Sequence, residues 1–229
     1  MGNVPVPPGI KEIAALFTSQ GKQLYLVGGA VRDHLRGKKP QDWDLATDAL
    51  PEEVIELFRQ AKSPAKVIPT GIKHGTVTVH YRGGAFEVTT FRTESDYQDG
   101  RHPGSISYAR TIEEDLSRRD FTMNAIAIKM PGGQTVDPFG GIPDIKQRLI
   151  RCVGDPRDRF GEDGLRPLRA VRFAAQLDFT VDAPTLDAIR PSLDVTAKVS
   201  EERFRDELNK IVASPRPSVG FRLMEQTGL

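Results

Sequence analysis

The sequence contains almost nothing that could cross-link it covalently. Cys152 is the single cysteine among 229 residues, so no disulfide can form within the chain and a structural zinc site would lack thiolate ligands. A chain of this length can bury a sizeable core without such cross-links, as one large domain or two small ones. This cysteine usage is typical of a reducing compartment.

The chain also lacks long apolar runs and a strong net charge. No run approaches the ~20 residues that cross a bilayer, and residues 1–8 lack the cationic and apolar regions of a leader peptide. We therefore predict a cytoplasmic protein without membrane contact. The net charge of +1 says little about partners and nothing about oligomeric state. The arginines between residues 148 and 172 could bind phosphate or base edges, or could form a solvated helix face.

Residue patterns predict an α/β first part and an all-helical second part. Strands are predicted at residues 24–27, 43–46, 65–69, 76–81, 85–91 and 124–129, and a long polar loop at 94–110. Helices follow Asp155, an N-cap residue before a proline, at about 156–176, 183–191, 200–213 and 217–226. Pro167 and Gly164 predict a kink in the first of these helices.

The most informative pattern is a glycine pair followed by two aspartates. Gly28 and Gly29 precede Arg32, an arrangement that offers backbone N–H groups and a cation to a phosphate. Asp42 and Asp44 follow, and two carboxylates at i and i+2 on a strand point to the same face. Each pattern alone has an ordinary interpretation, as a turn or as solvated aspartates. Because the two patterns occur in this order and each lies beside a strand, together they predict a site that binds a nucleoside triphosphate and two Mg²⁺. The chemistry that such a site indicates is the transfer of a nucleotide.

A third carboxylate is common in two-metal sites, and Glu87 is the best candidate. It places a charge in the otherwise apolar strand predicted at 85–91. The alternative is an ordinary strand residue on the open face of the sheet.

Five segments resemble, in chain order, the motifs of class II tRNA nucleotidyltransferases, the bacterial CCA-adding enzyme and poly(A) polymerase family of the polymerase-β-like superfamily. Residues 26–44 resemble the catalytic motif, and 118–125 the motif that closes on ribose and triphosphate. Residues 137–141 resemble the hinge between head and neck. Residues 162–169 resemble the nucleotide-selecting motif, and 200–208 the neck motif that steadies it. The resemblance covers residues 24–212.

The resemblance implies a fold and an activity. The fold class is α+β, with a nucleotidyltransferase head at residues 1–152, built on a mixed sheet of about five strands backed by helices, and a helical neck at 153–229. The body and tail domains of the family would be absent, and the active site would lie in the cleft between head and neck. The activity would be template-independent addition of C and A from CTP and ATP to the 3′ end of tRNA, with release of pyrophosphate, by a two-metal mechanism.

Roles follow for matching positions. Asp42, Asp44 and Glu87 would be catalytic, and Asp42 and Asp44 would hold two Mg²⁺. The residues expected to bind nucleotide are Gly28, Gly29, Arg32, Arg119, Asp120, Asn124, Asp163, Arg166, Arg169 and Arg172.

Four of these residues recur every three positions from Asp163 to Arg172 and predict a stripe on one helix face. The carboxylate of Asp163 could accept a hydrogen bond from the exocyclic amine of cytosine or adenine, while a neighbouring guanidinium donates to the ring. Uracil and guanine would present an oxygen to the carboxylate and be rejected. The alternative is an ordinary Asp–Arg pair of little energetic value.

Two segments bear on the subclass. Residues 92–103 resemble the flexible loop of enzymes that add all three nucleotides, and residues 70–76 resemble the same type. CC-adding, A-adding and poly(A)-synthesising relatives remain alternatives. Two other classes also remain: a non-catalytic nucleotide- or RNA-binding module, and an aspartate-nucleophile phosphatase, although Ala46 stands where such phosphatases carry a hydroxyl residue.

Overall fold

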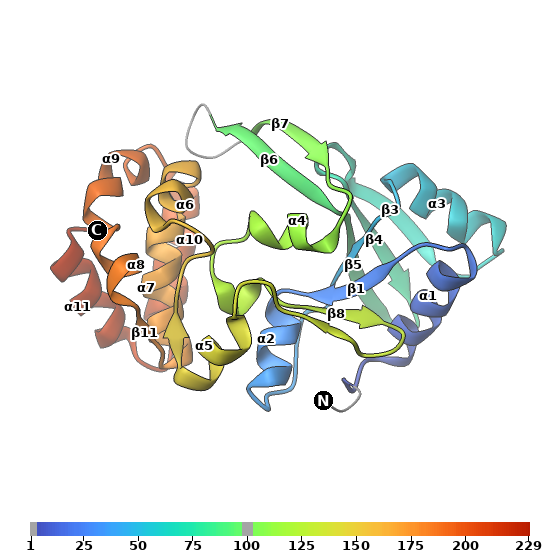
Figure 1. The fold of residues 1–229 in the computed structure, drawn as a ribbon, viewed down its shortest axis with the longest axis horizontal. Coiled ribbons are helices and arrows are strands. Elements are labelled where there is room, and N and C mark those ends of the chain that lie inside the picture. The colour runs from blue at the N-terminus through green and yellow to red at the C-terminus, as the bar shows by residue number, and fades with distance from the viewer. Residues whose placement is uncertain (1–3, 98–102) are drawn as a thin grey trace. The chain divides into compact units, whose positions relative to one another are not determined.

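The computed structural model describes the backbone of residues 4–97 and 103–229 and the side chains of 4–93 and 107–229 (Figure 1). The chain forms two compact units. The sheet unit comprises Met1–Thr93, Ile106–Arg118 and Asn124–Pro138. The helical unit comprises Glu94–Ser105, Arg119–Met123 and Phe139–Leu229. The predicted division at residue 152 stays a prediction.

A seven-stranded mixed sheet forms the centre of the sheet unit (Figure 1). Its strand order is β3-β4-β5-β2-β1-β8-β9. Within this sheet, β2 and β5 are the only neighbouring strands that pair in parallel among the residues described. The strands are β1 (Leu24–Val27), β2 (Asp44–Thr47), β3 (Lys66–Gly71), β4 (Thr76–Tyr81), β5 (Gly84–Thr90), β8 (Ala127–Met130) and β9 (Thr135–Val136). The predicted mixed sheet is confirmed, with seven strands in place of about five. The two-residue β9 is too short to show an alternating pattern.

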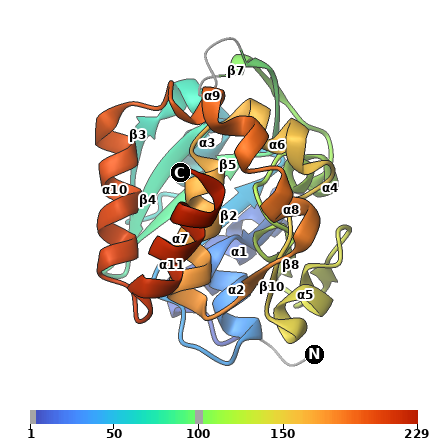
Figure 2. The same ribbon diagram turned by 90° about the vertical axis from the view of Figure 1, so that its left-hand side faces the viewer.

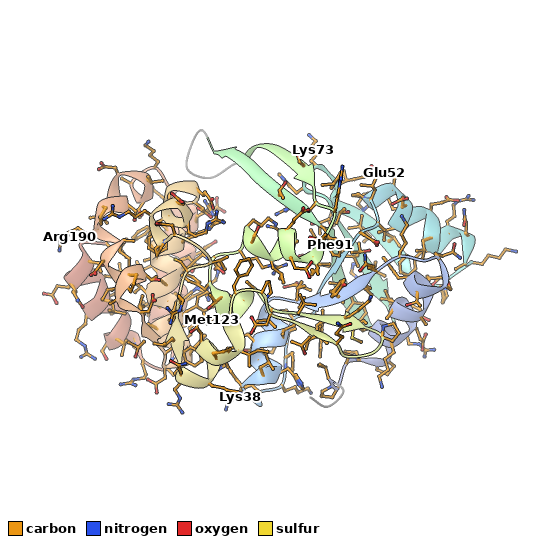
Figure 3. All side chains as sticks on the ribbon, viewed as in Figure 1. Lys38, Glu52, Lys73, Phe91, Met123 and Arg190 are labelled. Atoms are coloured by element: carbon orange, nitrogen blue, oxygen red, sulfur yellow. The ribbon has the colours of Figure 1, made fainter. Side chains whose placement is uncertain are left out.

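Helices α1 (Pro8–Ser19), α2 (Gly29–Leu35), α3 (Pro51–Gln60) and α4 (Ile112–Ser117) complete the sheet unit. The apolar stripe of α1 is buried, and the ring of Phe17 meets that of Phe58 on α3 edge-on, with centroids 6.3 Å apart. Phe91, labelled in Figure 3, directly follows β5 and is fully buried, and its ring centroid lies 5.8 Å from that of Tyr25 on β1. The first contact joins α1 to α3, and the second joins β1 to the end of β5. Such aromatic pairs contribute more than area burial alone.

The predicted loop at 94–110 is wrong for the residues described there. Strands β6 (Arg92–Tyr97) and β7 (Pro103–Tyr108) form a separate two-stranded sheet. The sequence did not predict these strands because their residues are mostly polar, so neither strand shows an alternation of apolar and polar residues. Residues 98–102, which carry the centre of the predicted flexible loop, lie outside the described residues.

The helical unit contains α5 (Gly141–Gln147), α6 (Pro156–Glu162), α7 (Arg166–Leu177), α8 (Ala183–Asp187), α9 (Leu193–Thr196), α10 (Glu201–Val212) and α11 (Pro217–Thr227). α10 and α11 both pack on α7 (Figure 2). The predicted helical second part is confirmed, apart from the two-residue strand β11 (Thr180–Val181), which pairs in parallel with β10 (Leu149–Ile150). No helix within the described ranges, 4–97 and 103–229, has the length and apolar character needed to span a membrane.

The helix predicted at 156–176 is two helices rather than one kinked helix. Asp163 adopts an extended conformation, with φ −136° and ψ 109°, and ends α6. Pro167 then lies in the first turn of α7, where its missing N–H costs no helical hydrogen bond. Between them, Gly164 packs so closely on another segment that a Cβ would lie 2.4 Å from the carbonyl oxygen of Val195. The glycine and the proline therefore separate two helices.

Candidate nucleotide and metal site

Strand register brings two of the predicted catalytic carboxylates together. Asp44 is the first residue of β2, and its partner on the parallel strand β5 is Glu87. Residues directly opposite on neighbouring strands project from the same face of a sheet. On the other side of β2, Asp44 is opposite Val27, the last residue of β1 before the glycine pair. Asp44 thus lies between Glu87 and the phosphate-binding turn predicted at Gly28.

Asp42 lies just outside β2, in a bend, and is exposed. The alternation of side chains along a strand therefore does not fix its direction, contrary to the expectation that both aspartates belong to the strand. No three acidic, histidine or cysteine side chains in the described part of the chain form a preassembled metal cage. Mg²⁺ does not require one, since it commonly binds one or two carboxylates together with substrate phosphates and water. The open, oxygen-only donor set of Asp42, Asp44 and Glu87 fits such an ion.

The turn between β1 and α2 has the conformation that the glycine pair predicts. Gly28 has φ 69° and ψ −138°, a region of the backbone map essentially restricted to glycine. Gly29 begins α2, and a Cβ on it would lie 3.6 Å from Nη2 of Arg32. The guanidinium of Arg32 is therefore folded back over the first residue of the helix, close to the backbone N–H groups that a phosphate would use.

Two side chains hold the Arg32 guanidinium in this place. Its Nε and Nη2 donate to the two carboxylate oxygens of Asp33 at 3.0 and 3.1 Å. Its Nη1 donates to Oδ1 of the buried Asn124 at 3.0 Å. The structure thus brings together Gly28, Gly29, Arg32 and Asn124, four of the residues predicted to bind nucleotide, in the sheet unit.

In the helical unit, Asp120 and Arg169 pair with each other. The buried Asp120 accepts hydrogen bonds at Oδ2 from Nη2 and Nε of Arg169, at 2.6 and 2.9 Å. Burial acts to lower the pKa of Arg169, but the carboxylates of Asp120, Glu207 and Asp163, with Asp120 the strongest, together outweigh burial and raise it. The guanidinium also lies 5.5 Å from the centroid of the Phe173 ring. Arg119 precedes this pair in sequence and is half-buried.

Asp163 has two hydrogen-bond donors in the structure. Its Oδ1 accepts from the backbone N–H of Leu165 at 3.0 Å. Its Oδ2 accepts from Nη2 of Arg203 on α10, also at 3.0 Å. Sequence reasoning placed Arg203 in a steadying motif but did not predict this contact. The signal for this contact was the motif match, because the segment 200–208, which contains Arg203, resembles the motif that steadies the segment 162–169.

The two other arginines of the predicted stripe are buried in ion pairs. Arg166 donates to the carboxylate of Glu162 and to the carbonyl oxygen of Arg159. Arg172 donates to Glu207 and stacks on the Phe173 ring, 3.9 Å from its centroid. Asp163 precedes α7 rather than lying on it, so the three-residue spacing does not form one continuous stripe. Each of the three arginines on α7 has its own acidic partner.

Burial and the opposite charge compete at the Arg172–Glu207 pair. Burial, together with the nearby charge of Arg169, lowers the pKa of Arg172 more than the carboxylates of Glu207 and Asp120 raise it. Burial alone would raise the pKa of Glu207, yet Arg172 and Lys210 outweigh burial and lower it. The lowered pKa of Glu207 favours its ionised form beside the Arg172 guanidinium, a group that keeps its proton in proteins.

Comparison with known proteins finds a matching family for each of two segments of the chain. Residues 24–151 match the family described as the poly A polymerase head domain. Residues 178–229 match the family described as the probable RNA and SrmB-binding site of polymerase A.

Among curated proteins, the chain is 47% identical over 222 residues to a CCA-adding enzyme of Lactobacillus helveticus, covering 96% of this chain and 54% of that protein. It is 48% identical over 224 residues to one of Geobacillus sp., covering 97% and 54%. The chain therefore spans about half the length of the curated relatives it matches.

Two solved structures are similar over nearly the whole chain. The first is the Bacillus stearothermophilus CCA-adding enzyme in complex with CTP, with TM-score 0.88, 43% identity and coverage of 98% of this chain and 53% of that one. The second is a tRNA nucleotidyltransferase complexed with a primer tRNA and an incoming ATP analog, with TM-score 0.75, 29% identity and coverage of 94% and 60%.

Proposed function

Because the chain belongs to the poly A polymerase head domain family, we propose that it is the nucleotide-transferring part of a CCA-adding enzyme. It would add C and A, without a nucleic-acid template, to the 3′ end of tRNA from CTP and ATP. The observation that carries the proposal is the register of β2, which sets Asp44 between Glu87 and the glycine turn. The similar structures with CTP and with primer tRNA and an ATP analog support the choice of substrates and partners.

The residues divide into a triphosphate site and a carboxylate group. The backbone N–H groups after Gly28 and the guanidinium of Arg32 would bind the triphosphate, with Asn124 holding that guanidinium. Asp42 and Asp44 would hold two Mg²⁺, and these ions, when bound, neutralise charge on the triphosphate and favour the ionised hydroxyl.

In the proposed reaction, the oxygen of the RNA 3′-hydroxyl attacks the α-phosphorus of CTP or ATP. A new phosphorus–oxygen bond forms, the bond to the β-phosphate oxygen breaks, and pyrophosphate leaves. The hydroxyl proton passes to a carboxylate of the group formed by Asp42, Asp44 and Glu87. Glu87 suits this role because it is exposed and opposite Asp44 in the sheet.

Base selection would rest on the helical unit. The carboxylate of Asp163 would accept a hydrogen bond from the exocyclic amine of cytosine or adenine, and a neighbouring guanidinium would donate to the ring. Facing a carbonyl oxygen of uracil or guanine, the same carboxylate would leave two acceptors unpaired, which a buried site rejects strongly. Arg119, Asp120, Arg166, Arg169 and Arg172 would complete this pocket.

We also propose head and neck parts divided near residue 152, and a cytoplasmic location, where tRNA, CTP and ATP are present.

The test is incorporation into tRNA that lacks its terminal trinucleotide. The chain is incubated with Mg²⁺ and with CTP, ATP, UTP or GTP singly, and then with CTP and ATP together, and product lengths are measured. We expect two additions with CTP alone and a third when ATP is also present. Asp44→Ala should abolish every addition, whereas Asp187→Ala, which changes an exposed aspartate on α8, should leave product lengths unchanged.

Each alternative gives a different product. Long adenosine tracts would indicate a poly(A) polymerase, and additions limited to C or to A would indicate a partial enzyme. Mg²⁺-dependent CTP binding without incorporation would favour a binding module. A trapped phospho-aspartate would favour a phosphatase.

A further inference from the structure

The sheet has a covered face and an open face where β4 and β5 run side by side. Helix α3 packs on β3 and β4, and the side chains of Val77, Val79, Phe86 and Val88 are buried on the covered face. The side chains that alternate with them project from the opposite face, and each of these is exposed or half-buried. The open face comprises Thr76, Thr78 and His80 of β4 and Ala85, Glu87 and Thr89 of β5.

The strand order gives the open face a direction relative to the proposed reaction. The glycine turn and Arg32 follow β1, on one side of Asp44, and Glu87 lies on the other side. In nucleotide transfer the attacking and leaving oxygens lie roughly in line, on opposite sides of the phosphorus. Because pyrophosphate would leave toward the glycine turn, the attacking 3′-hydroxyl arrives from the side of Glu87, which is the open face.

Two pairs of threonine hydroxyls lie beside Glu87 on this route. Thr78 is directly opposite Glu87 on β4, and its Oγ1 lies 2.6 Å from Oγ1 of Thr70 on β3. Thr89 follows Glu87 by two positions on β5, and its Oγ1 lies 3.0 Å from that of Thr76. A hydroxyl carries one hydrogen and two acceptor lone pairs. Each pair therefore uses one hydrogen internally and keeps the other to donate outward.

The charge of these strands suits an anionic ligand. Glu87 is the only acidic residue in β3, β4 and β5, which the structure describes from end to end. Lys66 of β3 is opposite His80 of β4, and both are exposed. Hydroxyl and cationic side chains hold the phosphates and sugars of nucleic acids without reading the bases. The open face therefore has the chemistry of a surface for a sugar–phosphate backbone.

A hollow lies at the turn between β4 and β5, at the end of the open face. It has a volume of about 630 Å³ and is lined by Pro64 and by residues 80–85, among which His80 and Ala85 belong to the open face. A site of this size accommodates a small molecule such as a nucleoside. Ala85 is two residues from Glu87 along β5, a distance of about 7 Å. A strand whose 3′ end is at Glu87 therefore reaches the hollow with its next nucleoside.

We propose that the open face binds the 3′-terminal nucleotides of the RNA strand that accepts the new nucleotide. The inference rests on the proposed function, which supplies the direction of attack. The threonine hydroxyls donate to phosphate oxygens or accept from ribose hydroxyls beside Glu87, and the hollow receives the next nucleoside. Because contacts to sugar and phosphate do not read the base, the same surface serves the strand after each addition, although its last nucleotide has changed.

The test separates the KM for the acceptor RNA from the KM for CTP. Incorporation of C is measured with tRNA that lacks its terminal trinucleotide, first with tRNA varied at saturating CTP and then with CTP varied at saturating tRNA. Thr78→Val replaces the hydroxyl with a methyl group, and we expect the KM for tRNA to rise by about three- to tenfold, the value of one hydrogen bond. The KM for CTP should stay within about twofold, since the glycine turn and Arg32 are unchanged.

Two matched variants show whether the hydroxyl and its place are responsible. Thr78→Ser keeps the hydroxyl at the same position and should keep the KM for tRNA within about twofold of the parent. Thr18→Val removes an exposed hydroxyl from α1, outside the open face, and should leave both KM values unchanged.

A second arm tests charge at an exposed position and also covers the case that Thr78→Val does not fold. Ala85→Glu places a carboxylate on the open face and should raise the KM for tRNA, because like charges repel. Ala85→Lys places a cation at the same position and should lower it. Both effects should shrink as the salt concentration rises, since salt screens exposed charges.

Failure of the inference and failure of the proposed function give different results. A parent chain that incorporates no nucleotide overturns both. A parent that incorporates C overturns the inference alone if the KM for tRNA is unchanged in a folded Thr78→Val variant, or equal in the two Ala85 variants. So does a rise in the KM for CTP as large as the rise for tRNA, because the open face would then hold the nucleotide rather than the acceptor strand.

Discussion

At the scale of single residues, Gly164 shows how closely the linker between α6 and α7 is packed. A Cβ at this position would lie 2.4 Å from the Val195 carbonyl oxygen, a backbone atom that cannot move aside cheaply. We expect Gly164→Ala to lower the free energy of unfolding by about 1–3 kcal/mol or more, the usual penalty for overpacking. Urea denaturation followed by circular dichroism measures it.

Gly161 provides the matched control three residues earlier. It lies in α6 and is exposed, and a Cβ there would meet nothing within 4 Å among the residues described. Gly161→Ala should therefore raise the free energy of unfolding by up to ~1 kcal/mol, because alanine favours the helix. Equal effects of the two substitutions would contradict the close packing of Gly164.

The sequence predicted some residue contacts and could not predict others. Asp44 and Glu87 each stood out as a charge beside an apolar strand, and strand pairing brings them together. Asp163 and Arg203 are 40 positions apart, and their contact depends on how α10 packs on α7. Side-chain pairs between such elements leave no local pattern. The roles of the predicted site residues in nucleotide binding stay predictions.

At the scale of elements, the ion pair between Glu207 and Arg172 joins α10 to α7. Removing one member of a buried pair leaves the other charge uncompensated, so Glu207→Gln should lower the free energy of unfolding by about 3 kcal/mol at pH 7. The pKa of Glu207 is lowered in the folded chain: burial opposes this shift, but Arg172 and Lys210 outweigh it. The pair's contribution is therefore complete above about pH 4.5, the ordinary pKa of a glutamate, and is lost as the pH falls through the lower folded pKa.

The measurement for this pair is urea denaturation at several pH values. The difference between the parent and Glu207→Gln should be constant from pH 6 to 8 and shrink below about pH 4.5. Asp206→Asn changes an exposed neighbour on the same helix and should show little effect at any pH. A difference between parent and Glu207→Gln that grows in acid would contradict the charged pair.

Elements with an apolar pattern were predictable, and those without one were not. The strands β4 and β5 were predictable because Val77, Val79, Phe86 and Val88 alternate with other residues along the sequence. The structure buries all four side chains. The strands β6 and β7 have no such pattern. The sequence predicted only a kink where the structure separates α6 from α7. The backbone of Val195, which leaves no room for a Cβ on Gly164, lies 31 residues further along the chain, so no local pattern could indicate it.

At the scale of the whole molecule, the two compact units are interleaved along the sequence. Arg119–Met123 belongs to the helical unit, although Ile106–Arg118 and Asn124–Pro138 on either side belong to the sheet unit. The last passage between units falls at Pro138–Phe139, within the predicted hinge segment. Sequence patterns divide a chain into consecutive segments. They therefore could not predict that the five residues Arg119–Met123 belong to the helical unit. Within the helical unit, the ring of Phe121 packs edge-on against that of Phe173, with centroids 5.8 Å apart.

Binding of a nucleotide with its metal ions should stabilise the whole chain by mass action. At a CTP concentration about a hundred times its dissociation constant, the gain is about 2.7 kcal/mol, which raises the thermal midpoint of a chain of this size by roughly 5–10 °C. We expect this rise with CTP and Mg²⁺ together, measured by scanning calorimetry, and its loss when EDTA removes the metal. Asp44→Ala should abolish the rise because it removes a proposed metal ligand, whereas Asp187→Ala should preserve it. A rise of the same size in EDTA would mean that Asp42 and Asp44 do not bind the nucleotide through a metal ion.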